Sequence, residues 1–229
     1  MKASPSRKRA APVADYATRR TMMVDTQVRP SDVTKFPIID AMLSLPRETF
    51  VPSHLREAAY IGENLDLGGG RVMLEPRTLA KMVDALDIRP GHVVLDLGCG
   101  LGYSTALAAR LADFVVGVED DETRADEAQQ ILSEEGIDNA AVVSGPLAEG
   151  AAKSAPYDIV MIQGAIETLP EAIAEQVKDG GRIGAIFATG ALGTVRIGHK
   201  LDGRVSWRYA FNAGAPVLDG FVAARTFAL

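Results

Sequence analysis

The sequence predicts an α/β protein built on a doubly wound, mostly parallel sheet, with an antiparallel C-terminal edge and an N-terminal helical extension. Short apolar runs alternate with helix-like stretches through the middle of the chain, which is typical of parallel strands joined by crossover helices. A glycine-rich turn at residues 98–102 follows the first of these runs. Near the C-terminus, two strand-like runs flank the turn Asp202-Gly203, which favours an antiparallel hairpin.

The composition suits one α/β unit with an extension. Of the 229 residues 47% are hydrophobic, and no apolar run reaches the roughly 18 residues of a membrane span. The single cysteine, Cys99, lies in the glycine turn with no histidine nearby, which favours a small residue in a crowded turn over a catalytic thiol. The three histidines lack metal-ligand spacing. We therefore expect a cytoplasmic protein, monomeric by default, with no membrane partner and no metal site.

Charge and composition divide the chain into three parts. Residues 1–21 combine basic side chains with Pro, Ser and Ala, which predicts a disordered arm. Residues 22–90 form the helical extension, expected to cover the ligand site, and residues 91–229 form the ligand-binding domain. Because the net charge of −6 includes the basic arm, the rest of the chain is more acidic still, which argues against a nucleic acid partner.

The individual elements follow from periodicity and from helix start and stop signals. Order is expected to begin near Met22. The extension is predicted to contain a helix capped by Ser31 or Asp32 and ended by Pro46, a short helix at 53–60, a glycine cluster at 68–70, an extended segment at 71–75 and an amphipathic helix at 78–86. The domain is predicted to contain strands at 93–97, 114–118, 141–143, 157–162, 183–188, 195–201, 205–211 and 221–227, and helices at 104–111, 122–135 and 169–177.

The glycine turn indicates a nucleotide site. Gly98, Gly100 and Gly102 let the main chain turn sharply and approach a ligand, and the next helix presents unpaired N–H groups to it. No Lys-Ser/Thr pair follows the glycines, which excludes a phosphate-binding P-loop. Tyr103 stands where a dinucleotide fingerprint requires glycine.

The turn resembles the glycine loop of class I methyltransferases, a Rossmann-like family that binds S-adenosylmethionine and releases S-adenosylhomocysteine. The resemblance implies that Asp96 lies near the methionine part and that Glu119, at the end of the next strand, holds the ribose hydroxyls. Asp121 is interpreted as a solvated helix start, and Asp120 as either such a start or a lining residue. The expected cofactor-binding residues are Asp96, Gly98, Gly100, Gly102, Tyr103, Glu119, Asp120, Pro146, Leu147 and Gln163.

Residues 23–211 resemble the protein-L-isoaspartate O-methyltransferases more specifically. Residues 46–52 reproduce that family's pattern PRE-x-FVP, and Ala59-Tyr60 its AY pair. Further matches are Pro156, Tyr157, Asp158, Ala165, Pro170, Glu175, Gln176, Gly180, Gly181 and Arg182. The resemblance implies methylation of isoaspartyl carboxylates in damaged proteins. The alternatives are a cofactor-binding homologue without isoaspartyl activity and a methyltransferase for another acceptor.

Two departures from the family pattern fall at functional positions. The family's TISQP becomes residues 72–76, which puts Leu74 at the place of the active-site serine, and its GDG becomes residues 145–147, which removes an acid expected near the adenine amine. Three interpretations of Leu74 stay open. It lines the same substrate site, with Thr78 or a backbone N–H as the orienting donor, or it lines a more apolar pocket for another acceptor. In the third, the site binds the cofactor without turnover. Leu74 could equally be a plain core leucine. No catalytic residue is assigned.

Overall fold

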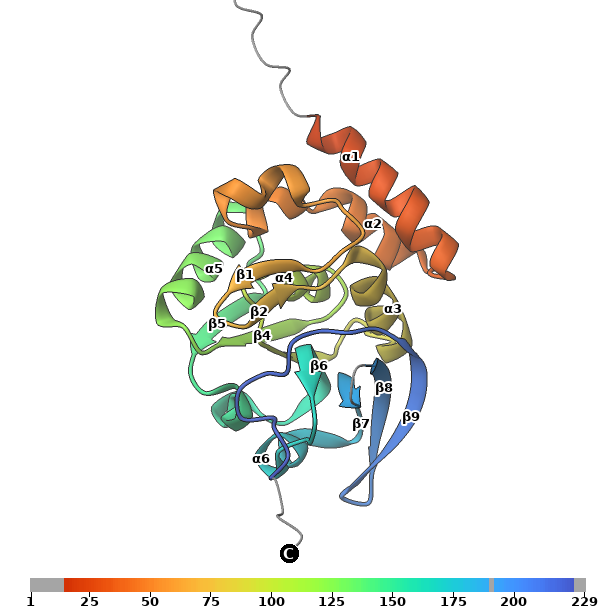
Figure 1. Ribbon diagram of the computed structural model, residues 1–229. Coiled ribbons are helices and arrows are strands. Elements are labelled where there is room, and N and C mark those ends of the chain that lie inside the picture. The colour runs from red at the N-terminus through yellow and green to blue at the C-terminus, as the bar shows by residue number, and fades with distance from the viewer. Residues whose placement is uncertain (1–14, 190–191, 225–229) are drawn as a thin grey trace, which may run out of the picture.

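The computed structural model describes residues 15–189 and 192–224 as a central sheet with a helical layer on one face (Figure 1). Seven strands lie in the order β5-β4-β3-β6-β7-β8-β9. The strands from β5 to β7 in this order pair in parallel, whereas β8 pairs antiparallel with both β7 and β9. Their bounds are β3 Val93–Leu97, β4 Phe114–Glu119, β5 Ala140–Ser144, β6 Tyr157–Ile166, β7 Val177–Thr189, β8 Leu192–Leu201 and β9 Arg204–Asn212. The predicted fold class is therefore confirmed, including the antiparallel edge.

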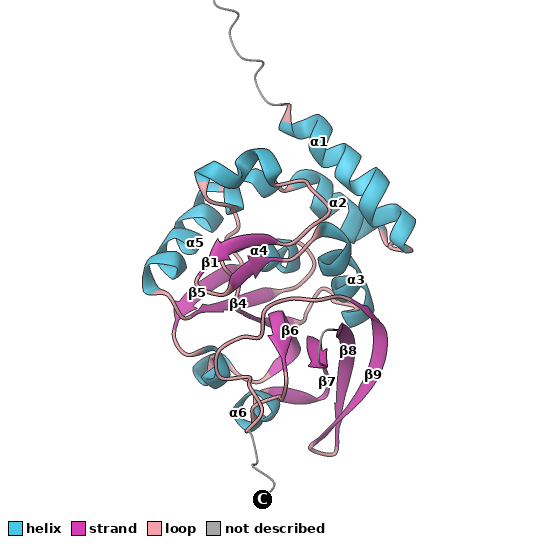
Figure 2. Ribbon diagram, viewed as in Figure 1, coloured by secondary structure: helices cyan, strands magenta, loops and turns pink. Residues whose placement is uncertain are grey.

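The two faces of the sheet are covered differently (Figure 2). One face packs against α3 (Pro76–Leu86), α4 (Tyr103–Ala109) and α5 (Glu122–Glu134). The other face is covered by α6 (Glu171–Glu175), by the short 3-10 turn Leu147–Glu149 and by the C-terminal coil that carries Leu218 and Phe221. The buried apolar side chains divide accordingly into one cluster on each face, and burial of this area supplies the main stabilisation of the fold.

The N-terminal helix begins earlier than the sequence suggested. Helix α1 spans Tyr16–Met23, and the Asp15 carboxylate accepts a hydrogen bond from the Thr18 N–H at 3.0 Å as its N-cap. Arg19 pairs with Glu57 at 2.9 Å, and the Arg20 Nε donates to the Tyr60 hydroxyl at 3.0 Å. The expected start of order near Met22 is thus wrong, because these basic side chains pair with the extension instead of staying solvated. The rest of the predicted arm, residues 1–14, lies outside the described residues.

The remaining N-terminal elements place a small hairpin over the glycine turn. A π-helical turn, Val24–Val28, and 3-10 turns at Arg29–Ser31, Arg47–Phe50 and Ser53–Ala58 accompany helix α2, Phe36–Ser44. Neither Ser31 nor Asp32 caps α2, whose N-cap is Lys35 with Pro37 in the first turn, a position where proline loses no hydrogen bond. Strands β1 (Leu65–Gly68) and β2 (Arg71–Met73) pair antiparallel, and the glycine cluster forms their turn.

The C-terminal segment after β9 crosses the carboxyl end of β6 (Figure 1). The Ala165 N–H donates to the Pro216 carbonyl at 2.8 Å, and the Leu218 N–H donates to the Ala165 carbonyl at 2.9 Å. The predicted strand at 221–227 is wrong for residues 221–224, which stay irregular because Phe221 is buried as a single anchor, and residues 225–229 lie outside the described part. In the described ranges, no helix combines the length and the apolar character needed to cross a membrane.

Candidate functional site

The glycine turn follows β3 at the carboxyl edge of the sheet. Gly98, Gly100 and Gly102 all have positive φ, and the Gly98 N–H donates to the Val118 carbonyl of β4 at 2.9 Å. The positive φ of Gly100 favours glycine there, and a Cβ would also press on the terminal methyl of Leu67 in β1 at 2.7 Å, a contact that a turn of the leucine side chain would relieve. The turn therefore has the left-handed, closely approached backbone that the sequence predicts.

Asp96 at the end of β3 is fully buried and accepts three hydrogen bonds. The Ser104 and Thr105 hydroxyls donate to Oδ2 at 2.6 and 2.7 Å, and the Gln163 Nε2 donates to Oδ1 at 2.7 Å. Burial raises the pKa of Asp96, and these hydrogen bonds limit the rise. The carboxylate thus joins the glycine turn, the start of α4 and the end of β6.

Glu119 at the end of β4 is also fully buried, and both of its oxygens are engaged. Its Oε2 accepts from the Gly100 N–H at 2.9 Å, while its Oε1 accepts from Arg71 Nε at 3.2 Å and Arg124 Nη1 at 2.9 Å. Burial raises the pKa of Glu119, and the two guanidinium charges act against that rise. The carboxylate assigned to the ribose therefore already has two cationic partners from the chain itself.

Asp120 shares one of these partners. Arg71 is 2% exposed, and its Nη2 donates to Asp120 Oδ2, so that one guanidinium bridges two neighbouring carboxylates. Burial acts to raise the pKa of Asp120. A hydrogen bond with Glu119 and the charge of Arg71 nevertheless hold this pKa below its ordinary value. Asp121 caps α5 by accepting from the Arg124 N–H at 2.8 Å, in agreement with its interpretation as a helix start.

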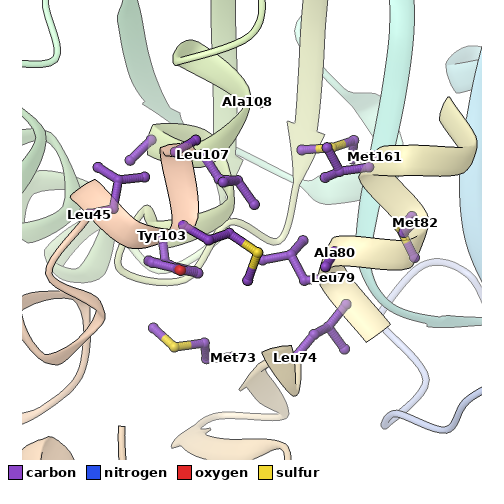
Figure 3. Packing of buried hydrophobic residues seen from close by; sticks show 14 of the residues in the cluster. Leu45, Met73, Leu74, Leu79, Ala80, Met82, Tyr103, Leu107, Ala108 and Met161 are labelled. Carbon is purple, nitrogen blue, oxygen red and sulfur yellow. The ribbon is translucent and has the colours of Figure 1, made fainter. Parts of the chain in front are cut away.

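A small cavity of about 10 Å³ lies between the hairpin, α3 and the glycine turn. Leu74, Tyr103 and Gln163 line it together with Met73 and Cys99. Figure 3 shows Met73, Leu74, Leu79 and Tyr103 converging around this space. Burial raises the pKa of the Cys99 thiol, which agrees with a structural role. The cavity is predominantly apolar and holds about one water by volume.

The predicted donor Thr78 does not line this cavity. Its hydroxyl donates to Glu75 Oε1 at 2.7 Å, and the residue is 1% exposed on α3. The backbone of Leu74 is instead held by Arg47, whose Nη2 donates to the Leu74 carbonyl at 2.7 Å and whose Nε donates to the Ala59 carbonyl at 2.7 Å. The guanidinium also lies 4.7 Å from the centre of the Tyr103 ring. The motif residues 46–52 thus position the segment that carries residue 74.

A larger hollow of about 360 Å³ lies on the other side of the strand ends. It brings together the predicted residues Asp120, Pro146 and Leu147 with Asp219 and Gly220 of the C-terminal segment. The Leu147 side chain would also lie 3.5 Å from a Cβ on Gly98, so this hollow adjoins the glycine turn. Five of the predicted cofactor residues therefore line these two spaces, Tyr103 and Gln163 the small cavity and Asp120, Pro146 and Leu147 the hollow, whereas Asp96, Glu119 and the three glycines line neither.

Sequence reasoning missed three residues of this site. Arg71 and Arg124 bond Glu119, and Asp219 lines the larger hollow. Arg71 directly follows the glycine cluster, but nothing in its position in the sequence identifies Glu119, 48 residues on, as its partner. Arg124 and Asp219 lie in a charged helix and a loop, where nothing distinguishes them from solvated residues.

The parallel unit β3-β4-β5, with a glycine turn after β3 and an acid at the end of β4, is the arrangement expected of a class I methyltransferase. Residues 19–202 match the family model described as "Protein-L-isoaspartate(D-aspartate) O-methyltransferase". The chain belongs to this family and is a methyltransferase of the protein-L-isoaspartate type, which confirms the assignment made from residues 46–52 and the downstream motifs.

Individual relatives agree with the family model. A protein-L-isoaspartate O-methyltransferase of Methylorubrum extorquens is 36% identical over 178 residues, which cover 76% of each chain. One of Koribacter versatilis is 32% identical over 190 residues, covering 83% of this chain and 86% of the relative.

Among solved structures, a protein-L-isoaspartate O-methyltransferase superposes with a TM-score of 0.78 at 23% identity, covering 88% of this chain and 66% of the other. A putative one from Plasmodium falciparum, in complex with S-adenosyl-L-homocysteine, gives 0.75 at 15% identity, covering 90% and 99%. At these identities the two structures support the fold.

Proposed function

We propose that this chain transfers the methyl group of S-adenosylmethionine to the carboxylate of isoaspartyl residues in damaged cytoplasmic proteins. The observation that carries the proposal is the meeting of the glycine turn with buried Glu119, under an extension whose residues 46–52 carry the family pattern. The acidic balance of the chain favours a protein acceptor over a nucleic acid.

The donor set fits the cofactor in chemistry. Gly100 leaves room for close backbone approach, and a carboxylate at the end of β4 suits ribose hydroxyls, as acids do in related nucleotide folds. We assign the adenine to the hollow of about 360 Å³, and the methionine part to the side of Asp96 and Gln163. A pocket for a whole small ligand commonly occupies about 300–1,000 Å³.

Asp219 offers a replacement for the family acid that Pro146 removes. Both residues line the same hollow, and the Asp219 side chain is exposed there. A carboxylate accepts hydrogen bonds from an exocyclic amine whether it comes from the turn after β5 or from the C-terminal segment. We therefore assign recognition of the adenine amine to Asp219.

The chemistry asks little of the protein beyond positioning. When bound, S-adenosylmethionine supplies an electrophilic methyl group on a sulfonium. The acceptor carboxylate, with a pKa near ~4, is ionised at neutral pH and needs no general base. Because charge is neutralised as the ester forms, a dry surface favours the reaction, and the apolar walls provided by Leu74, Met73 and Leu79 exclude water. Orientation of the two reactants alone can contribute ~7–11 kcal/mol.

Leu74 weakens one part of this positioning. A serine hydroxyl at this place would donate to the acceptor carboxylate and contribute ~1–3 kcal/mol. Its loss slows transfer by about tenfold to a hundredfold, which leaves most of the positional effect intact.

The test is methyl transfer to an isoaspartyl peptide, followed by mass spectrometry, with the matching aspartyl peptide as the control. The proposal expects the isoaspartyl peptide alone to gain the mass of one methylene group. If S-adenosylhomocysteine binds but neither peptide is methylated, the isoaspartyl assignment fails. The chain is then a binding homologue or a methyltransferase for another acceptor.

A further inference from the structure

The acid assigned to the ribose is held by a side chain of the β1–β2 hairpin. Arg71 reaches from β2 to Glu119 Oε1 at 3.2 Å and also bonds Asp120, while Leu67 of β1 packs on Gly100. Arg71 is 2% exposed and Glu119 is fully buried. A hairpin therefore covers the glycine turn, with its arginine in the place where sugar hydroxyls would bond.

The hairpin is built as a separate unit. Its two strands pair with each other in a sheet of their own, apart from the seven-stranded sheet. Two strands alone are marginally stable in water. The turn consists of Gly68, Gly69 and Gly70, all with positive φ, whereas the base is tied by the Glu75 N–H donating to Asn64 Oδ1 at 2.8 Å. The covering position is held by the contacts of Arg71 and Leu67, by Arg124 Nη2 donating to the Gly68 carbonyl at 3.3 Å, and by the burial of Leu65, Val72 and Met73.

The available space shows that this cover and the ligand compete. The cavity beneath the hairpin measures about 10 Å³, roughly the space of one water and far below a cofactor pocket of about 300 Å³ or more. The larger hollow is open and Asp120 lines it, but Arg71 bonds both Asp120 and the neighbouring Glu119. A ligand hydroxyl that bonds Glu119 Oε1 must therefore compete with the guanidinium for that oxygen.

We propose that Arg71 is the gate residue of the cofactor site, which holds the hairpin Leu65–Met73 closed on Glu119 and is displaced when the ribose hydroxyls bind. This inference rests on the proposed function. The state with the hairpin closed on Glu119 competes with cofactor binding. The apparent affinity for the cofactor is therefore the intrinsic affinity of the open state multiplied by the fraction of molecules that are open. Arg71 thereby sets the cofactor concentration at which the enzyme begins to work.

Two readouts on the full chain test the gate. Hydrogen exchange without ligand reports whether the hairpin amides of residues 65–73 open, and calorimetry with S-adenosylhomocysteine reports affinity. The variant is Arg71→Met, and the matched control is Arg89→Met, which removes an exposed guanidinium that pairs with Asp87 before the start of β3, at the opposite end of that strand from the glycine turn. Arg71→Lys serves as a second variant, because a lysine keeps the charge but bridges the two carboxylates poorly.

The gate predicts faster exchange of the hairpin amides in Arg71→Met and an affinity about tenfold or more above the wild type, with Arg89→Met unchanged. Arg71→Lys should change both readouts in the same direction by less, and it decides the case if the methionine variant does not fold. Unchanged or weaker binding in both Arg71 variants overturns the gate while leaving the proposed function intact, provided the wild type binds. If neither the wild type nor the Arg71 variants bind, the gate and the proposed cofactor both fall.

Discussion

Gln163 and Asp96 join the carboxyl ends of two adjacent parallel strands, with Gln163 Nε2 donating to Asp96 Oδ1 at 2.7 Å. Both side chains are buried, at 3% and 0% exposure. Because hydrogen bonds to a buried charge are among the stronger ones in proteins, this pair fixes the spacing between the glycine turn and β6.

Gln163→Leu should therefore destabilise the fold. The substitution removes the donor to Asp96 Oδ1 and leaves a buried carboxylate oxygen without it, which costs about 1–3 kcal/mol. Urea unfolding measures the loss. Gln130→Leu is the control, since the Gln130 amide bonds Glu134 at 2.8 Å on an exposed helix face. Equal stability of the two variants would show that the Asp96 contact has no special weight.

Glu119→Gln should weaken S-adenosylhomocysteine binding. An amide keeps the size of the side chain but removes the negative charge that makes bonds to ribose hydroxyls strong, for an expected loss of about 1–3 kcal/mol. Calorimetry with the folded variant gives the affinity. The comparison is made in an Arg71→Met background, where the gate contact is already absent, and there an affinity equal to that of the parent would mean that the ribose lies elsewhere.

Asp219→Asn should lower affinity for adenine-containing ligands. The carboxylate only accepts hydrogen bonds, whereas an amide can turn its NH₂ group toward the adenine amine. The expected loss is about 1 kcal/mol, as for an exposed hydrogen bond. Asp126→Asn on the exposed face of α5 is the control of equal charge. Identical affinities in the two variants would rule out Asp219 as the adenine contact.

Leu74→Ser should raise methyl transfer to an isoaspartyl peptide by about tenfold to a hundredfold, because it restores a hydroxyl donor at the acceptor carboxylate. Since Leu74 is 2% exposed in an apolar cluster, the same change should lower the free energy of unfolding by about 2–4 kcal/mol. Initial rates at saturating cofactor measure the first effect. A slower variant that remains folded would show that the leucine itself serves the acceptor.

Asp158 should make stability depend on acid pH. Burial acts to raise its pKa, but hydrogen bonds from Lys178 Nζ and the Val93 N–H, both at 2.8 Å, hold it below its ordinary value. Its folded pKa thus lies below the unfolded value near ~4, so its contribution is present above that value and is lost as the pH falls through the folded pKa. Asp158→Asn should flatten the decline between about pH 5 and pH 2 in urea unfolding. If the stability of Asp158→Asn declines as steeply with falling pH as that of Asp138→Asn, which removes an exposed acid, this prediction is contradicted.

What the sequence predicts well in this protein is local. The glycine turn and strands β3 and β4 follow from residues within one stretch of chain, because periodicity and left-handed glycines are properties of neighbouring residues. The cap of α2 was assigned wrongly, since Pro37 could start the helix without Ser31 or Asp32.

The rest of the site depends on contacts between distant residues. Arg71 lies 48 residues before Glu119, and the meeting of Asp219 with Pro146 requires the C-terminal coil to cross β6. A charged residue has no periodicity that identifies its partner, so a sequence can show that a buried acid is present without showing which base neutralises it. The helix α1 was missed for the same reason, because its arginines pair with Glu57 and Tyr60.

The Arg47 guanidinium donates hydrogen bonds to two backbone carbonyls of the extension, those of Ala59 and Leu74. The same guanidinium lies 4.7 Å from the centre of the Tyr103 ring in α4, so the extension is packed onto the domain and is not a detachable module. A fragment that starts at residue 91 would keep strands β3 to β9 and the glycine turn after β3, yet it would lack Arg47 and the segment with Leu74 that the proposed function places at the acceptor. Chimaeras with other methyltransferases must consequently exchange residues 46–76 as one block, because a boundary inside that block would part the arginine from the backbone it aligns.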